Sequence, residues 1–290
     1  MPRQEDLPTT DTSLYPGHVP INPFQRALLT LGSAVMGLVD THRHGPSLSL
    51  SFLEPATHPQ SDAHRAHPAR PPADMIATLS ETSSPLASLR RLQSHLRSSP
   101  SGRALLRTRP TLTTSTLDLA ALAALPQGTL GHAYAAWLAR NRVSPDTRDP
   151  VRYIAHDEEL AYVMRRYRES HDLYHVVLGF GVSLPAELVV KWFEAANFGL
   201  PVAVLSGLVG PLRMEAGERK RLWRAYGPWA LRAGARAQCL IGVHWEREWE
   251  TPLDELRARW GVERPPVGFK AWRDEGRRLE ALRRAAEEGV

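Results

Sequence analysis

Residues 157–187 read DEELAYVMRRYRESHDLYHVVLGFGVSLPAE, and this stretch predicts two helices joined by a tight turn. Apolar residues from Leu160 to Leu178 recur at the i, i+3, i+4, i+7 spacing of one helix face. Gly179, Gly181 and Pro185 interrupt that pattern before a second apolar segment begins. A helix–turn–helix unit of this kind brings residues from both helices to one place.

Two histidines lie on the predicted inward face. His171 and His175 are spaced i, i+4, so that two imidazoles can bind one ion, and Asp172 borders the same face. Glu187 falls in the first turn of the second helix and could close the site from across the turn. Four nitrogen and oxygen ligands without sulfur suit Zn, Fe(II) or Mn. The alternative is a pair of hydrogen-bonded core histidines.

The charged residues of the histidine helix lie off the apolar stripe. They are therefore predicted to lie away from the core, with Glu169 exposed on the solvent side. The set comprises Arg165, Arg166, Arg168 and Glu169.

Helical patterns continue over most of the chain, and no strand-turn-strand signal or internal repeat competes with them. In the first helix, Asn22 is the expected N-cap and Pro23 the first helical residue. The fold class predicted is all-α, as a single multi-helix domain. The expected helices span 22–40, 85–97, 115–125, 129–142, 157–178, 185–199, 201–209, 216–226, 228–249, 252–260 and 269–287.

The domain organisation is predicted from shifts in composition. Residues 1–13 form a polar leader that we expect to be disordered, and residues 14–273 form the helical domain. A Pro-, Ser- and His-rich stretch at about 43–74 is predicted to be a disordered insertion. Residues 274–290 form a charged C-terminal helix or tail.

Composition narrows the functional classes. The formal net charge is +5, and 33 of the 36 basic residues are arginines, since only Lys191, Lys220 and Lys270 are lysines. This bias reflects either codon composition or a surface that meets anionic lipid or phosphate. Nucleic acid is not predicted as a partner, because basic residues alternate with acidic ones and no recognition motif is present. A single cysteine, Cys239, excludes an internal disulfide and a cysteine zinc cluster.

Two segments bear on location. The acidic leader argues against an ordinary mitochondrial transit peptide, and no secretory signal precedes a cleavage site. Residues 195–212, AANFGLPVAVLSGLVGPL, are uncharged but broken by Gly and Pro. They are interpreted as a buried core segment, with the wall of an apolar pocket or a face touching the bilayer as alternatives.

His171, Asp172, His175 and Glu187 spell HDxxH-(x11)-E, which resembles the zinc-ligand motif of the ubiquinone (coenzyme Q) biosynthesis protein "coenzyme Q four" family. The resemblance covers residues 14 to 273. Ser80 replaces a glycine usual in the family, and the leader and the insertion at 46–73 depart from the pattern. The blocks that carry the likeness are LYPGHVPINPFQRALLTLGSAVMGL (14–38), IATLSETSS (76–84), VRYIAHDEELAYVMRRYRESHDLYHVVLG (151–179) and WEREWETPLDELRARWGV (245–262).

The resemblance implies a function. It implies a mitochondrial protein bound peripherally to the matrix side of the inner membrane, working with other ubiquinone-biosynthesis enzymes in a multi-subunit complex and organising it. The implied reaction is metal-dependent C1 decarboxylation of 4-hydroxy-3-methoxy-5-polyprenylbenzoate, with an oxidative version that also hydroxylates C1. Zn²⁺, or another divalent metal such as Fe²⁺, is the implied cofactor, and His171, Asp172, His175 and Glu187 are the implied metal-binding and catalytic residues. A homodimer is expected from the family.

Two other functions compete with this one. A non-catalytic scaffold that binds polyprenyl lipid and holds a structural metal has the same sequence features. A metal phosphohydrolase is suggested by the two His-Asp pairs at 156–157 and 171–172, but it needs a further aspartate ligand downstream. The aspartates that follow Asp172, namely Asp254 and Asp274, both fall in charged helices, which disfavours that function.

Overall fold

The computed structural model describes residues 14–39, 75–84, 86–147, 150–154 and 157–288, and this part of the chain is helical without a β-strand. The all-α prediction is confirmed. The leader 1–13 and the whole insertion predicted at about 43–74 lie outside the described residues. The α-helices are α1 (Pro23–Val39), α2 (Met75–Thr82), α3 (Leu86–Ser98), α4 (Pro100–Thr108), α5 (Leu119–Ala124), α6 (Leu130–Asn141), α7 (Glu158–Leu178), α8 (Leu184–Phe198), α9 (Pro201–Val209), α10 (Ala216–Arg236), α11 (Leu253–Trp260) and α12 (Phe269–Glu288).

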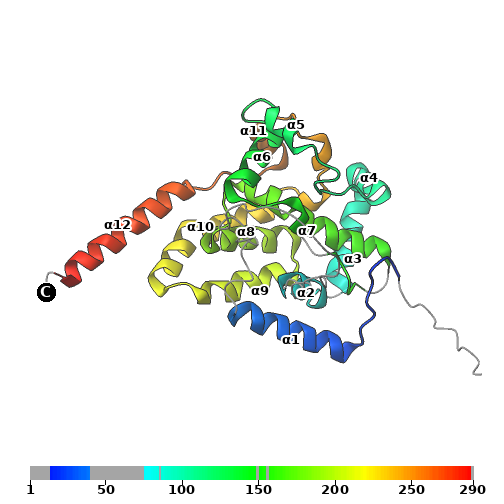
Figure 1. The fold of residues 1–290 in the computed structure, drawn as a ribbon, viewed down its shortest axis with the longest axis horizontal. Coiled ribbons are helices and arrows are strands. Elements are labelled where there is room, and N and C mark those ends of the chain that lie inside the picture. The colour runs from blue at the N-terminus through cyan, green and yellow to red at the C-terminus, as the bar shows by residue number, and fades with distance from the viewer. Residues whose placement is uncertain (1–13, 40–74, 85, 148–149, 155–156, 289–290) are drawn as a thin grey trace, which may run out of the picture.

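Helix α7 runs through the middle of the molecule, where α3, α6 and α8 pack against it (Figure 1). Asp157 caps its start by accepting a hydrogen bond from the Leu160 amide at 2.6 Å. Gly179 ends it in the left-handed conformation, with φ of 81°, which a residue bearing a Cβ rarely adopts. The chain therefore turns sharply into α8, as the sequence predicts.

The polar side of α7 is also buried, which corrects the prediction that its charged residues lie away from the core. Arg166 is 0% exposed and forms an ion pair with Glu246, whereas Arg168 pairs with buried Glu81 at 2.8 Å. The carboxylate of Glu169 is only 8% exposed and accepts a hydrogen bond from the Leu112 amide at 3.1 Å. The reason is that elements distant in sequence cover most of α7, so the charges they bury need partners, while Arg165 stays 39% exposed.

Helix α10 passes through Pro228 and ends at Arg236, so the helix predicted at 228–249 is wrong at both ends. Burial of Trp229 and the residues that follow against α8 offsets the missing amide of the proline. Asn197 explains the end of the helix. Its side-chain amide donates to the Gly234 carbonyl at 2.8 Å, and its oxygen accepts from the Leu240 amide at 3.0 Å. Two short 3-10 turns, η4 (Leu240–Gly242) and η5 (Trp245–Arg247), follow instead of a helix.

Helix α4 has no counterpart in the sequence prediction. Ser99 caps it by accepting a hydrogen bond from the Gly102 amide at 3.0 Å, and Pro100 takes the first helical position. The Ser-Pro-Ser-Gly run at 99–102 therefore starts a helix.

Helix α1 begins as predicted. The Asn22 side chain accepts a hydrogen bond from the Gln25 amide at 2.9 Å, and the Gln25 side chain accepts one from the Asn22 amide at 2.9 Å. Both α1 and α9 pack against α2 (Figure 1). The uncharged segment 195–212 is only partly core: Val202 is 1% exposed, whereas Leu208 and Leu212 are 69% and 67% exposed.

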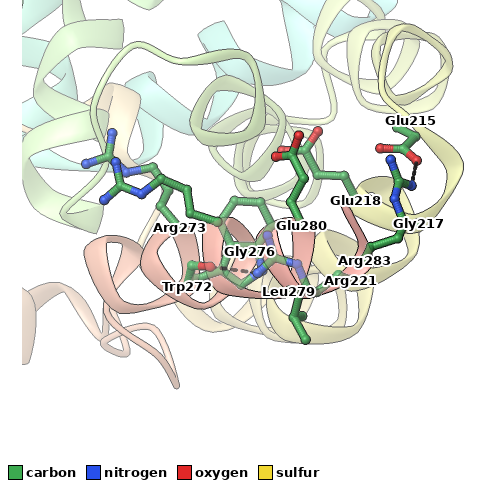
Figure 2. Close-up of a pocket in the computed structure, with 11 residues that line it drawn as sticks. Glu215, Gly217, Glu218, Arg221, Trp272, Arg273, Gly276, Leu279, Glu280 and Arg283 are labelled. Atoms are coloured by element: carbon green, nitrogen blue, oxygen red, sulfur yellow. Dashed lines mark hydrogen bonds and ion pairs between the residues drawn. The ribbon is translucent and has the colours of Figure 1, made fainter. Parts of the chain in front are cut away.

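Helix α12 is anchored at its start and then projects away from the other helices (Figure 1). Trp272 is buried, and the Arg221 guanidinium of α10 lies 3.9 Å from the centre of its indole ring and donates to its carbonyl at 2.6 Å. Figure 2 shows the shallow charged hollow between the two helices, bordered by the ion pair of Glu215 with Arg283. None of the predicted site residues lines this hollow. Among the described residues, no helix is both long and apolar enough to cross a membrane.

Candidate metal centre

Three of the four predicted ligands come together in the structure. His171 Nε2 lies 3.2 Å from His175 Nε2 and 3.2 Å from Glu187 Oε2. The other oxygen, Oε1 of Glu187, is 3.4 Å from His175 Nε2. These three residues therefore offer ligand atoms that all lie within 4.8 Å of one another.

The helix–turn–helix unit creates this arrangement. The i, i+4 spacing places the two imidazoles side by side on one face of α7, edge to face, with ring centres 4.7 Å apart and planes at 89°. Glu187 lies in the first turn of α8, where the partial positive charge of the helix end favours a carboxylate. The turn at Gly179 reverses the chain and directs that first turn toward the histidines.

Asp172 is the fourth predicted ligand, and it is not in the group of three. It lies on α7 between the histidines in sequence and is 4% exposed. A role for Asp172 at the metal stays a prediction.

Charge at the centre is set by burial and by the carboxylates. Burial raises the pKa of Glu187, but His175 and His171 outweigh that effect and hold the pKa well below its usual value. Burial and Lys191 lower the pKa of His171, yet Glu194 and Glu187 together raise it above its usual value. Glu187 is therefore held as a carboxylate beside the two imidazole rings.

The donor set fits a metal ion. Two ring nitrogens 3.2 Å apart can hold no more than one proton between them, whereas a cation accepts a lone pair from both. A tetrahedral zinc with ligand distances of about 2.0–2.1 Å places neighbouring ligand atoms about 3.3 Å apart. The observed nitrogen separation matches this value. Nδ1 of His175 has no hydrogen-bond partner among the described residues, so that imidazole depends on Nε2 for its polar contacts.

Access to the centre is one-sided. Glu187 has a side chain that is 27% exposed, whereas those of His171 and His175 are 8% and 1% exposed. The ring of Trp137 lies 5.4 Å from that of His175 and forms an aromatic wall. A ligand from solvent would thus reach the centre beside Glu187.

A second carboxylate, Glu194, is missing from the sequence prediction. It is 0% exposed, and its Oε1 lies 2.6 Å from Nδ1 of His171, on the ring edge opposite the metal ligands. Burial raises the pKa of Glu194, but Lys191 and His171 lower it by more, so that the pKa is about 2. The available signal was spacing, because Glu194 follows Glu187 by seven residues and so lies on the same face of α8.

The phosphohydrolase alternative finds no support in the arrangement. His156 lies outside the described residues, and Asp157 caps α7. Asp254 and Asp274 form ion pairs with Arg257 and Arg277 on the protein surface.

Fold and centre thus define a class of protein: it is all-helical, and two histidines and a carboxylate converge between two consecutive core helices. The chain belongs to the family described as coenzyme Q (ubiquinone) biosynthesis protein Coq4, whose model matches residues 60–266.

Relatives agree with that assignment, and a solved structure shares the fold. The chain is 41% identical over 261 residues to the mitochondrial ubiquinone biosynthesis protein COQ4 homolog of Danio rerio, covering 90% of this chain and 85% of the relative. It is 43% identical over 249 residues to the mitochondrial COQ4 protein of Coprinopsis cinerea, covering 86% and 75%. A crystal structure of a Nostoc punctiforme protein has the same fold, with a TM-score of 0.58, 21% identity, and coverage of 83% of this chain and 99% of the other.

Proposed function

We propose that this ubiquinone-biosynthesis protein is a metal-dependent lyase that removes the C1 carboxyl group of 4-hydroxy-3-methoxy-5-polyprenylbenzoate. An oxidative version replaces the carboxyl group with a hydroxyl group on C1, with dioxygen and water as co-reactants and CO₂ and hydrogen peroxide as the other products. The observation that carries the proposal is the convergence of two buried imidazole nitrogens and the Glu187 carboxylate at a tetrahedral spacing. His171, His175 and Glu187 hold the divalent metal, with Asp172 as the predicted fourth ligand.

The chain's own residues supply most of what the reaction needs. A bound Zn²⁺ or Fe²⁺ acts as a Lewis acid toward the carboxylate or phenolate of the substrate. The partly exposed edge at Glu187 gives the aromatic head group its access, and the buried ring of Trp137 packs beside His175 on the inner side of the centre. The two histidines are buried, so they exclude water from the inner side of the centre. Exclusion of water strengthens the electrostatic interactions that act on the substrate as CO₂ leaves.

The test of the activity uses purified protein loaded with Zn²⁺, Fe²⁺ or Mn²⁺ and a short-chain prenylated hydroxymethoxybenzoate. We expect one metal per chain, CO₂ release, and the decarboxylated or C1-hydroxylated ring by mass spectrometry. Variants His171→Ala and His175→Ala should lose both metal and activity. Stoichiometric metal without CO₂ release under all three metals would favour the non-catalytic lipid-binding scaffold, in which the metal is structural.

Peripheral attachment to the inner membrane is part of the same proposal, with an apolar face of α1 and α9 as the contact. Phe24, Leu28 and Leu31 follow the i, i+4, i+7 spacing of one stripe on α1 and are 76%, 61% and 65% exposed. Leu208 of α9 and Leu212, in the 3-10 turn that follows α9, are exposed as well. Side chains of this size exposed together favour insertion to the depth of the acyl boundary.

Positive charge lies next to part of this face. At the start of α10, Lys220 and Arg224 are exposed on either side of Trp223, which is 44% exposed. A tryptophan between basic residues suits an anionic membrane surface. Attachment of this kind serves a polyprenyl substrate, whose tail stays in the bilayer while its head reaches the metal.

Vesicle flotation tests the apolar face. Wild-type protein should float with anionic vesicles and be released by carbonate or high salt, whereas Leu28→Asp/Leu31→Asp should stay unbound. The matched control is Leu279→Asp/Leu282→Asp, which changes two leucines of α12 that are 50% and 58% exposed. Equal flotation of both double variants would remove this face from the proposal. Homodimerisation and contact with other ubiquinone-biosynthesis enzymes remain predictions.

A further inference from the structure

Glu194 is a fully buried carboxylate that the metal ligands alone do not explain. Its Oε2 accepts hydrogen bonds from the Tyr167 hydroxyl at 2.8 Å and from Lys191 Nζ at 2.7 Å. Its Oε1 lies 2.6 Å from Nδ1 of His171. Both oxygens are thus committed to polar partners inside a core that otherwise excludes water.

These contacts fix the proton on His171. A carboxylate at 2.6 Å requires a donor, so Nδ1 of His171 carries a hydrogen, and Nε2 is the nitrogen whose lone pair a cation can take. That lone pair is directed toward Glu187 and His175. Lys191 Nζ, 3.4 Å from Nδ1, has only protons to donate and cannot replace the carboxylate as acceptor.

The two histidines therefore differ. His171 is held at both ring nitrogens, whereas Nδ1 of His175 has no hydrogen-bond partner among the described residues. An imidazole that donates to a carboxylate is a better base toward a metal and has a fixed ring orientation. His171 is therefore the histidine whose ring orientation is fixed, and Glu194 is the residue that fixes it.

We propose that Glu194 is a positioning residue of the metal centre: it holds the tautomer and orientation of His171, while Tyr167 and Lys191 hold Glu194. This inference rests on the proposed metal site. It adds a carboxylate–histidine–metal arrangement that the HDxxH-(x11)-E motif does not contain.

The decisive variant is Glu194→Gln. A glutamine can accept from His171 through its oxygen only by presenting its amide hydrogens to Tyr167 and Lys191, and the Lys191 ammonium has no lone pair to accept one. One set of contacts must break, so His171 loses its fixed tautomer. We expect the Zn²⁺ affinity, measured by competition with a chromophoric chelator, to fall by about 10–100-fold. The visible spectrum of the Co²⁺-loaded protein should change as the imidazole reorients.

The matched control is Glu81→Gln. Glu81 is also a buried carboxylate, 2% exposed, that pairs with Arg168 at 2.8 Å and accepts two backbone amides, but it does not contact the metal centre. It should lower the thermal stability of the metal-free protein while leaving the Zn²⁺ affinity unchanged. This separates loss of a buried ion pair from loss of metal positioning.

Each possible outcome of the Zn²⁺-binding measurements either supports or overturns the inference about Glu194. Weaker Zn²⁺ binding in Glu194→Gln with unchanged binding in Glu81→Gln supports the inference. Wild-type affinity in a folded Glu194→Gln, or an equal loss in both variants, overturns it. Should Glu194→Gln fail to fold, Glu194→Asp withdraws the carboxylate by one methylene and the same loss is expected; unchanged affinity there overturns the inference as well. Absence of metal from the wild-type protein would instead overturn the proposed function.

Discussion

Replacing Glu187 with Gln tests the metal centre with the smallest change of shape. Glu187 supplies the only anionic ligand in the group of three, and its two oxygens lie 3.2 and 3.4 Å from the two ring nitrogens. Its side chain is 27% exposed at the start of α8, so the substitution opens no large apolar cavity. We therefore expect Glu187→Gln to fold and to bind metal weakly.

The magnitude follows from ligand linkage. Changes to outer-shell partners alone lower metal affinity about 10–100-fold, so loss of a charged ligand should cost at least about 100-fold. With free Zn²⁺ above both dissociation constants, a 100-fold loss removes about 2.7 kcal/mol of metal-linked stabilisation. For a domain of this size, the rise in Tm on adding Zn²⁺ should therefore be smaller in the variant than in the wild type by roughly 5–10 °C.

The assay is differential scanning calorimetry of each protein with Zn²⁺ and with chelator, alongside the decarboxylation assay. Glu158→Gln is the control, because its side chain is 57% exposed at the start of α7 and lies outside the metal group. It should shift stability by less than about 0.5 kcal/mol and keep the full response to Zn²⁺. If adding Zn²⁺ raised the Tm of Glu187→Gln as much as that of the wild type, the assignment of Glu187 as a ligand would be refuted.

Three further predictions concern the rest of the molecule. Glu246→Ala leaves Arg166 buried without its carboxylate and should lower the free energy of unfolding, measured in urea, by about 3–5 kcal/mol; a loss below 1 kcal/mol contradicts this. Burial raises the pKa of Cys239 to about 11, so alkylation at pH 8 should be on the order of a hundredfold slower in the folded than in the unfolded protein and should quicken as pH rises; equal rates would disprove it. Gly234→Ala places a Cβ 2.4 Å from the α8 backbone and should destabilise by about 1–2 kcal/mol, whereas Gly217→Ala, in open space on the same helix, should not destabilise; the reverse order in a urea titration argues against tight α8–α10 packing.

Local signals in the sequence predicted much of the fold. The cap at Asn22 and the turn at Gly179 are formed by residues next to the elements they begin or end, and both are confirmed. The spacing of His171 and His175 and the place of Glu187 at a helix start likewise depend on neighbours in the chain. Such features can be predicted because a short segment contains all of their determinants.

Features that depend on distant segments could not be predicted in this way. Periodicity separates apolar from polar residues, but it does not show that Glu246 and Glu81 come from far along the chain to pair with Arg166 and Arg168. The end of α10 is likewise set by Asn197, which belongs to α8. Glu194 was missed because its contacts with Tyr167 and His171 exist only once α7 lies beside α8.

The short turn after Gly179 also has a consequence for how the protein folds. The residues proposed to bind or orient the metal all lie between Tyr167 and Glu194, on two consecutive helices. Bringing them together requires closure of a short loop, whose entropy cost is lower than that of a contact between distant segments. The helical hairpin can therefore form before α1 or α12 docks, and a metal ion that binds it then accelerates folding rather than only slowing unfolding.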